Sequence, residues 1–200
     1  MQNKVLIGLS HSLERKDFRK KEVDWLKKKI QEYHPLKVGI ELPEDYLERE
    51  EFGLTYLVFS DIASYLKGLE IVVIPLENPE LRDYTSAFYL AKDVIKGKEK
   101  RKEIESNLKN IEKRDLSFSA PEQIRVYDHL KKTYRTALEI LDIAPTLEKM
   151  MKLEEDTNRK RENYMLQKIV DLDILIIGDG HAQYLKERLP EHEYVKSPFV

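Results

Sequence analysis

Hydrophobic residues in the first third of the chain fall into two alternating patterns. Short apolar runs at residues 4–9, 37–40 and 71–74 are typical of buried β-strands. Between these runs, apolar residues recur at every third or fourth position, as they do from Val23 to Tyr33, and this spacing predicts helices. Because each pair of parallel strands needs a long connection, the alternation favours a mainly parallel sheet covered by helices.

Prolines and a glycine set the predicted ends of these elements. The second strand is expected to stop at Glu41-Leu42-Pro43 and the third at Pro75, and Gly68 ends the helix between them. Glu41 is therefore expected at the C-terminal end of a strand.

Helical spacing then continues from residue 79 to about residue 170. Within this stretch, residues 97–115 are dense in charge but keep a thin apolar stripe, which predicts an exposed helix, with disorder as the weaker alternative. Strand patterns return at residues 173–177 and near residues 194–195. We therefore predict one α/β domain over residues 1–200. It has a central, mainly parallel sheet, with a mixed sheet as the alternative, flanking helices, and a long helical insertion between the N-terminal and C-terminal strands.

Composition narrows the classes of function. Lys and Arg number 35 against 37 Asp and Glu, which gives a net charge of −2, so we expect no binding to nucleic acid or to an anionic membrane. The sequence has no cysteine, and no apolar run approaches the ~20 residues of a membrane span. The N-terminal apolar run is too short for a secretory signal, so we expect a cytoplasmic protein. Abundant Lys and Glu with few Gly resemble the composition of thermophile proteins.

Two Gly-x-x-His segments follow predicted strands, and they are the main candidates for chemistry. They run from Gly8 to His11 and from Gly178 to His181. The C-terminal ends of parallel strands form the crevice where ligands bind, so His11, Glu41 and His181 are expected to converge there. The ordinary alternative for each segment is a turn whose histidine caps a helix. The occurrence of a pair at equivalent strand ends favours a site.

The three converging side chains allow two kinds of chemistry. His11, Glu41 and His181 could ligate a divalent metal ion, which would lower the pKa of a bound water to about 7. Without a metal, a neutral histidine could take a proton from water while Glu41 orients it or takes a second proton. A nucleotide site is a weaker hypothesis, because neither segment extends to a full Gly-x-Gly-x-x-Gly turn.

Other charged residues have an ordinary interpretation. The run from Glu154 to Glu162 is typical of a solvated helix face, although one of its arginines could reach the sheet edge and hold a carboxylate or phosphate. We expect His34, His129 and His192 to be surface residues.

Four segments occur in the order Gly8–His11, Val38–Leu42, Arg161–Met165 and Ile176–His181. With these segments the chain resembles the TraB/PrgY/GumN group, which is related to the Tiki proteases, the ChaN haem-binding lipoproteins and the erythromycin esterases. The resemblance implies an α/β fold with a helical region beside its sheet. Glu162 departs from the pattern, because many members have Asp there. The resemblance implies a site built from His11, Glu41, Arg161, Glu162 and His181.

The function expected from these residues is a metal-dependent hydrolase that cleaves a peptide or a similar amide or ester bond, with a small molecule or peptide as substrate. The alternative is a non-enzymatic protein that binds a haem-like or anionic ligand in the same crevice. A third hypothesis is an interaction module that self-associates through the helical insertion. Related proteins are variously metal-dependent proteases, metal-free esterases and haem binders, so the resemblance narrows the site more than the reaction.

Overall fold

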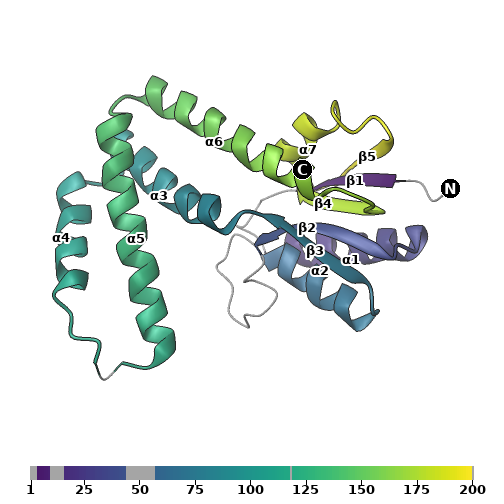
Figure 1. Cartoon of the computed structure of the whole chain (residues 1–200), viewed down its shortest axis with the longest axis horizontal. Coiled ribbons are helices and arrows are strands. Elements are labelled where there is room, and N and C mark those ends of the chain that lie inside the picture. The colour runs from purple at the N-terminus through teal and green to yellow at the C-terminus, as the bar shows by residue number, and fades with distance from the viewer. Residues whose placement is uncertain (1–3, 10–15, 44–56, 118, 200) are drawn as a thin grey trace. The chain divides into compact units, whose positions relative to one another are not determined.

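The computed structural model describes residues 4–9, 16–43, 57–117 and 119–199. Strands and helices alternate at both ends of the chain, and four helices separate the third strand from the fourth (Figure 1). This arrangement confirms the α/β fold and the long helical insertion. In chain order the elements are β1 (Lys4–Leu9), α1 (Lys16–Tyr33), β2 (Lys37–Pro43), α2 (Leu57–Gly68), β3 (Val72–Glu77), α3 (Pro79–Ile95), α4 (Arg101–Glu112), α5 (Pro121–Ile143), α6 (Leu147–Lys168), β4 (Ile174–Gly178), α7 (Asp179–Leu185) and β5 (His192–Lys196).

The five strands form one sheet in the order β3-β2-β4-β1-β5, and every strand pairing among the described residues is parallel. The expectation of a mainly parallel sheet is confirmed. β4 lies between β2 and β1, so the strands that carry the candidate motifs are neighbours. In this register Leu9 pairs with Gly178, and Ile40 pairs with Ile176.

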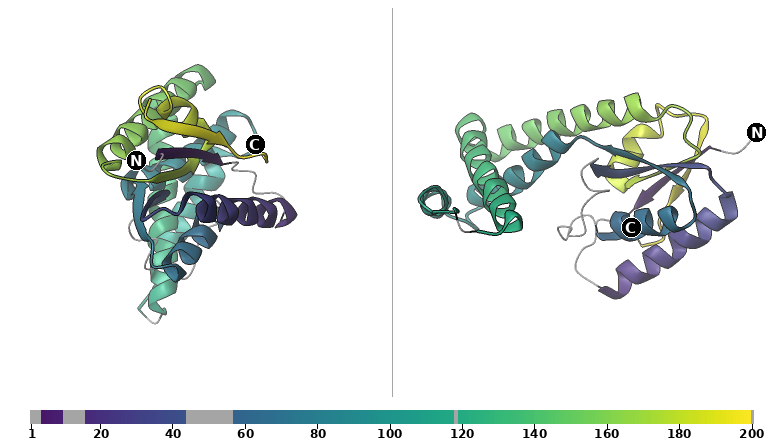
Figure 2. Two further views of the ribbon diagram at one scale, coloured as in Figure 1. Left: turned by 90° about the vertical axis from the view of Figure 1, so that its right-hand side faces the viewer. Right: turned by 60° about the horizontal axis from the view of Figure 1, so that its bottom comes forward.

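Each face of the sheet has its own apolar core. On one face, Val5 and Ile7 of β1 pack with α1 and α2, which lie side by side (Figure 2). On the other face, Leu6 and Leu175 pack with α7 and the C-terminal part of α6. The chain therefore leaves the adjacent strands β1 and β4 toward opposite faces. In parallel sheets, ligands commonly bind at such a switch point, beyond the C-terminal ends of the strands.

The chain divides into two compact units, Met1–Asn78 with Lys160–Val200, and Pro79–Arg159. The first unit contains the whole sheet. The second is helical: α3 and α5 pack through small side chains such as Ala91 and Ala137, and α4 buries Ile104 while its charged residues face solvent. The exposed helix predicted in this region is confirmed. A single domain, and self-association through the insertion, stay predictions.

Two strand ends differ from the expectation. β2 continues through Glu41 to Pro43, so Glu41 lies within the strand, and β3 continues past Pro75 to Glu77. Pro75 was expected to end β3. Because β3 is the edge strand of the sheet, a proline without an N–H group is tolerated there.

The predicted Gly-x-x-His turns also differ. Gly8 lies inside β1, Gly178 is the last residue of β4, and the following residues through His181 already belong to α7. His192, expected at the surface, is only 7% exposed. It is the first residue of β5, where it pairs with Lys4 of β1, and its Nδ1 lies 3.5 Å from Glu191 Oε1. A charged neighbour in the sequence therefore did not indicate an exposed side chain here. His34 and His129 are exposed, as expected.

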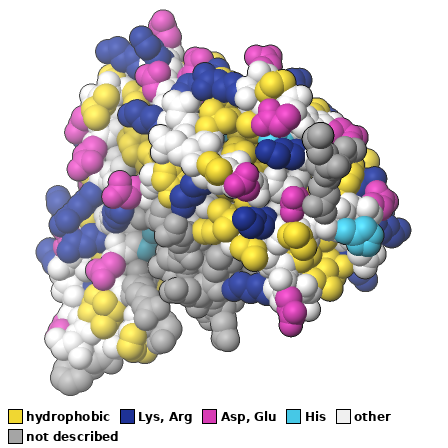
Figure 3. Space-filling model, turned by 45° about the vertical axis from the view of Figure 1, so that its right-hand side comes forward, with side chains coloured by type: hydrophobic (Ala, Val, Ile, Leu, Met, Phe, Trp, Pro, Cys, Tyr) yellow, Lys and Arg dark blue, Asp and Glu magenta, His cyan; other side chains and the backbone are white. Residues whose placement is uncertain are grey.

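Basic and acidic side chains are interspersed on the face shown in Figure 3, in keeping with the small net charge. Among the described helices, none combines the length and the apolar character needed to cross a membrane.

Candidate functional site

Four of the five predicted site residues meet at the C-terminal end of the sheet. β2 supplies Glu41, α6 supplies Arg161 and Glu162, and the first turn of α7 supplies His181. All four are buried, with exposed fractions between 1% for Glu41 and 8% for Arg161 and His181. The fifth predicted residue, His11, lies outside the described residues.

The carboxylate of Glu41 connects α6 to the end of β4. Its Oε1 accepts a hydrogen bond from Arg161 Nη2 at 2.8 Å, and its Oε2 accepts one from the backbone N–H of Gly178 at 2.5 Å. The pairing of Ile40 with Ile176 brings the Glu41 side chain next to this N–H group. A buried carboxylate needs such charge-assisted bonds, because they replace the water that it loses.

Glu77 is a site residue that the sequence analysis missed. Its side chain is fully buried, and Arg161 Nε donates to its two oxygens at 3.2 and 3.0 Å, while Arg161 Nη2 also contacts Oε2. Burial raises the pKa of Glu77, and the charge and hydrogen bonds of Arg161 oppose this rise. Glu77 lies two residues after Pro75, where the sequence was expected to leave the strand. Because an edge strand tolerates proline, an extension of the predicted strand past Pro75 would have placed Glu77 at the strand end.

The charges of this cluster do not balance when every carboxyl group is ionised. Glu41, Glu77 and Glu162 then carry three negative charges, and Arg161 carries one positive charge. Burial raises the pKa of Glu77, and the nearby charge of Glu41 adds to this rise, as expected for like charges close together in a buried site. Clusters of interacting buried ionisable groups are found most often at functional sites.

The imidazole of His181 is oriented by Glu162. Its Nδ1 lies 3.1 Å from Glu162 Oε1, and its Nε2 lies 3.8 Å from Glu41 Oε1. A neutral ring with its proton on Nδ1 donates to the Glu162 carboxylate and keeps a lone pair on Nε2. The carboxylate thus fixes both the tautomer and the ring plane, as in hydrolases that use histidine as a base.

The predicted metal site of His11, Glu41 and His181 is not tested, because His11 lies outside the described parts of the chain. Within these parts of the chain, no three His, Asp or Glu side chains are grouped so that they could share a metal ion. Moreover, the Glu41 oxygen nearest to His181 Nε2 is the one that receives the Arg161 guanidinium. A permanent cation on that oxygen opposes a divalent ion beside it. The metal prediction therefore depends on His11.

Gly8, the glycine of the first Gly-x-x-His segment, allows α7 to pack closely against β1. A Cβ atom at Gly8 would lie 2.7 Å from Asp179 Oδ1 and 3.1 Å from Ala182 Cβ. Gly8 therefore allows the first turn of α7 to approach β1 closely, which places His181 over the sheet edge.

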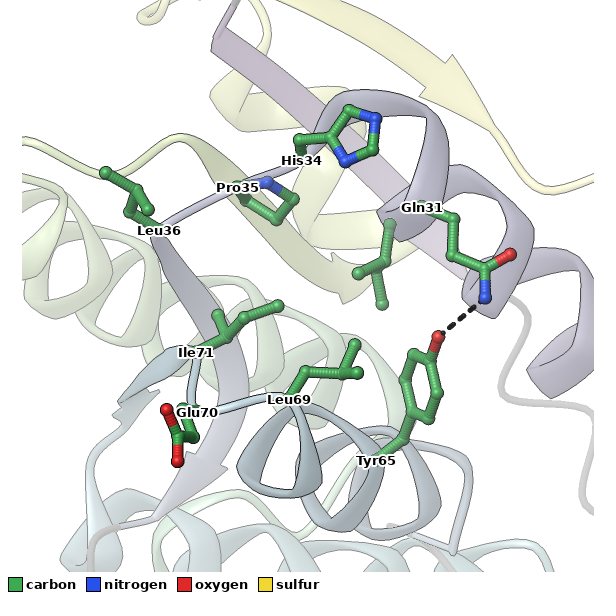
Figure 4. A pocket seen from close by; sticks show the side chains of 9 residues that line it. Gln31, His34, Pro35, Leu36, Tyr65, Leu69, Glu70 and Ile71 are labelled. Carbon is green, nitrogen blue, oxygen red and sulfur yellow. Dashed lines mark hydrogen bonds between the residues drawn. The ribbon is translucent and has the colours of Figure 1, made fainter.

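A cavity of about 360 Å³ lies at the other ends of the strands, before β2 and β3 (Figure 4). Leu69, Glu70 and Tyr65 line it, and Gln31 Nε2 donates to the Tyr65 hydroxyl at 3.1 Å. Its described lining includes no predicted site residue.

Protein-family models do not match this chain, and no curated protein sequence matches it. A solved structure of an erythromycin esterase mutant in its open conformation is similar to it, with 13% sequence identity and a TM-score of 0.42. The alignment covers 98% of this chain and 69% of that one. This similarity is too low to carry an argument about activity. The resemblance to the TraB/PrgY/GumN group therefore stays a prediction.

Proposed function

We propose that this protein is a hydrolase of ester or amide bonds in which His181 is the general base. The observation that carries the proposal is the hydrogen bond between Glu162 and His181 Nδ1, which leaves Nε2 available beside Glu41 and Arg161. An imidazole that a carboxylate orients through one ring nitrogen, with the other nitrogen facing the reaction, is the usual arrangement of a histidine general base.

The proposed reaction begins when His181 Nε2 takes a proton from a water molecule, whose oxygen attacks the carbonyl carbon of the substrate. Glu162 stabilises the imidazolium that forms. The positive charge of Arg161 stabilises the negative charge that develops on the carbonyl oxygen. The tetrahedral intermediate then collapses, and the imidazolium returns its proton to the leaving alcohol or amine, so protons and charge balance over the cycle.

Hydrolysis of a panel of nitrophenyl esters and fluorogenic peptide amides tests the proposal. Loss of a general base costs about 10²–10⁴ in rate, so we expect His181→Gln to reduce kcat at least a hundredfold. The control is His129→Gln, which changes an exposed histidine of the helical unit and should leave kcat unchanged. Equal activity of His181→Gln and the parent protein on every substrate cleaved would contradict the proposal.

The metal-dependent form of this hydrolase stays a prediction that needs His11 as a ligand. Treatment with a chelator separates the two forms. Activity that survives supports the proton-transfer mechanism, whereas activity that is lost and restored by one divalent metal supports the metal form. The rival function, binding of a haem-like ligand, predicts a Soret shift on titration with haemin that His181→Gln abolishes.

A further inference from the structure

We propose that Asp179 and Tyr194 are positioning residues that hold the first turn of α7, and with it the His181 imidazole, in the geometry that the reaction needs. This inference rests on the proposed role of His181 as the base. It concerns two residues that lie outside the cluster around Arg161.

Asp179 is the first residue of α7, and its carboxylate is tied to β5. The Tyr194 hydroxyl donates to Asp179 Oδ1 at 2.5 Å, and Gln183 Nε2 donates to the Tyr194 hydroxyl at 2.7 Å. Lys196 Nζ lies 3.7 Å from Asp179 Oδ2. These contacts join the first turn of α7 to an edge strand that is separated from β4 by β1.

α7 depends on such contacts because it is short. It has seven residues, and an isolated helix of that length does not hold its shape in water. Ala182 and Leu185 anchor it to the apolar core, but apolar contacts are non-directional and do not define its rotation as hydrogen bonds do. The hydrogen bonds at Asp179 and Gly178 remove that freedom at the end of the helix where His181 lies.

The geometry of β1 supports the same conclusion. The Asp179 carboxylate occupies the space that a side chain at Gly8 would fill. Asp179 Oδ1 thus packs against β1 and accepts hydrogen bonds from Tyr194 and, at 3.4 Å, from Gln183 Nε2. Burial, the hydrogen bond and the negative charge of Asp179 raise the pKa of Tyr194, so the phenol keeps its proton and remains a donor throughout the neutral range.

Tyr194→Phe is the most selective test, because it removes the hydroxyl group and keeps the ring in its packing. The matched control is Tyr65→Phe, which removes one phenol hydrogen bond at the opposite ends of the strands. NMR of ring-labelled histidine reports the His181 tautomer and the exchange of its Nδ1 proton with water. We expect Tyr194→Phe to speed this exchange at least tenfold, and Tyr65→Phe to leave it unchanged.

Asp179→Asn provides a second variant of nearly equal volume, and it should speed the exchange in the same direction. With a cleaved ester, Tyr194→Phe should lower kcat about tenfold and leave KM unchanged. The proposal is overturned when a folded Tyr194→Phe or Asp179→Asn protein shows the His181 signals and exchange rate of Tyr65→Phe. The NMR result needs no turnover, so it distinguishes failure of this inference from failure of the proposed hydrolase.

Discussion

Replacing Arg161 with methionine tests the physical basis of the site. The substitution keeps an apolar side chain of similar length and removes the guanidinium that binds Glu41 and Glu77. Because both carboxyl groups are at most 1% exposed, water cannot take the place of the arginine. Breaking a buried ion pair from one side costs about 3–5 kcal/mol, a large part of the 5–15 kcal/mol that holds a typical domain folded.

The loss of stability caused by Arg161→Met should increase as the pH rises. Burial already raises the pKa of Glu77, and loss of the Arg161 charge raises it further. A carboxyl whose pKa is higher in the folded state contributes stability below its unfolded value of about 4.3, and this stability is lost as the pH rises through the folded pKa. The difference between Arg161→Met and the parent protein should therefore be small near pH 4 and largest at pH 8.

Urea unfolding followed by circular dichroism at pH 4.5, 6 and 8 measures this difference. Adding Glu77→Gln to Arg161→Met should recover part of the lost stability at pH 8, because it removes one of the unpaired charges. The two variants and their combination form a double-mutant cycle that isolates the pair. A loss of less than about 1 kcal/mol at pH 8 would refute the account of Arg161 as the buried counterion.

Three further predictions concern packing, backbone and burial. Gly8→Ala should cost about 1–3 kcal/mol in urea unfolding because its Cβ would meet Asp179. The control Gly180→Ala has open space around it and lies in α7, so it should not destabilise the protein. Glu70 has a φ of 59°, so Glu70→Gly should relieve a left-handed backbone and stabilise the protein by about 0.5–1 kcal/mol; an unchanged Tm would contradict this. Burial lowers the pKa of His192, whose ring nitrogens have no hydrogen-bond partner among the described residues. Its contribution to stability is therefore complete above the ordinary histidine pKa and is lost as the pH falls through the folded pKa. His192→Leu should flatten the fall of Tm between pH 7 and 5, and an unchanged slope would show that His192 does not titrate on unfolding.

The fold class could be predicted from the sequence because parallel strands are covered on both faces. β1 and β4 are buried at nearly every position, so they appear as continuous apolar runs. The convergence of Glu41 with His181 also followed from sequence, because the C-terminal ends of parallel strands share one edge of a sheet. The order of the strands did not follow, because it depends on which surfaces the helices cover.

The charged run on α6 shows that a local sequence pattern cannot predict which of two nearby arginines is buried. Arg159 agrees with the ordinary interpretation: its side chain is 44% exposed and lies 3.7 Å from Glu155. The side chain of Arg161, two positions later, is only 9% exposed and binds Glu41 and Glu77. Two positions turn a helix by about 200°, so neighbours in one charged run face opposite sides. Only the position of the sheet decides which of the two is buried.

Glu77 and Tyr194 could not be assigned for a related reason, since their roles are created by pairing between distant segments. Glu77 belongs to the site because β3 runs through a proline at the edge of the sheet. Tyr194 reaches Asp179 because β5 pairs with β1 in a register that sets Tyr194 opposite Leu6 and Lys196 opposite Gly8. The local sequence around Glu77 or Tyr194 does not indicate which strand its segment pairs with, or in which register.

Burial of so many ionisable groups at one strand end is what favours a function for this edge. The sheet elsewhere is filled by Ile, Leu and Val, and apolar residues of similar volume would pack here without the cost of removing charges from water. Glu41, Glu77, Arg161, Glu162 and His181 are instead held by bonds that orient each of them toward the next. Stability alone does not require this arrangement, whereas the proton transfer that we propose for His181 does.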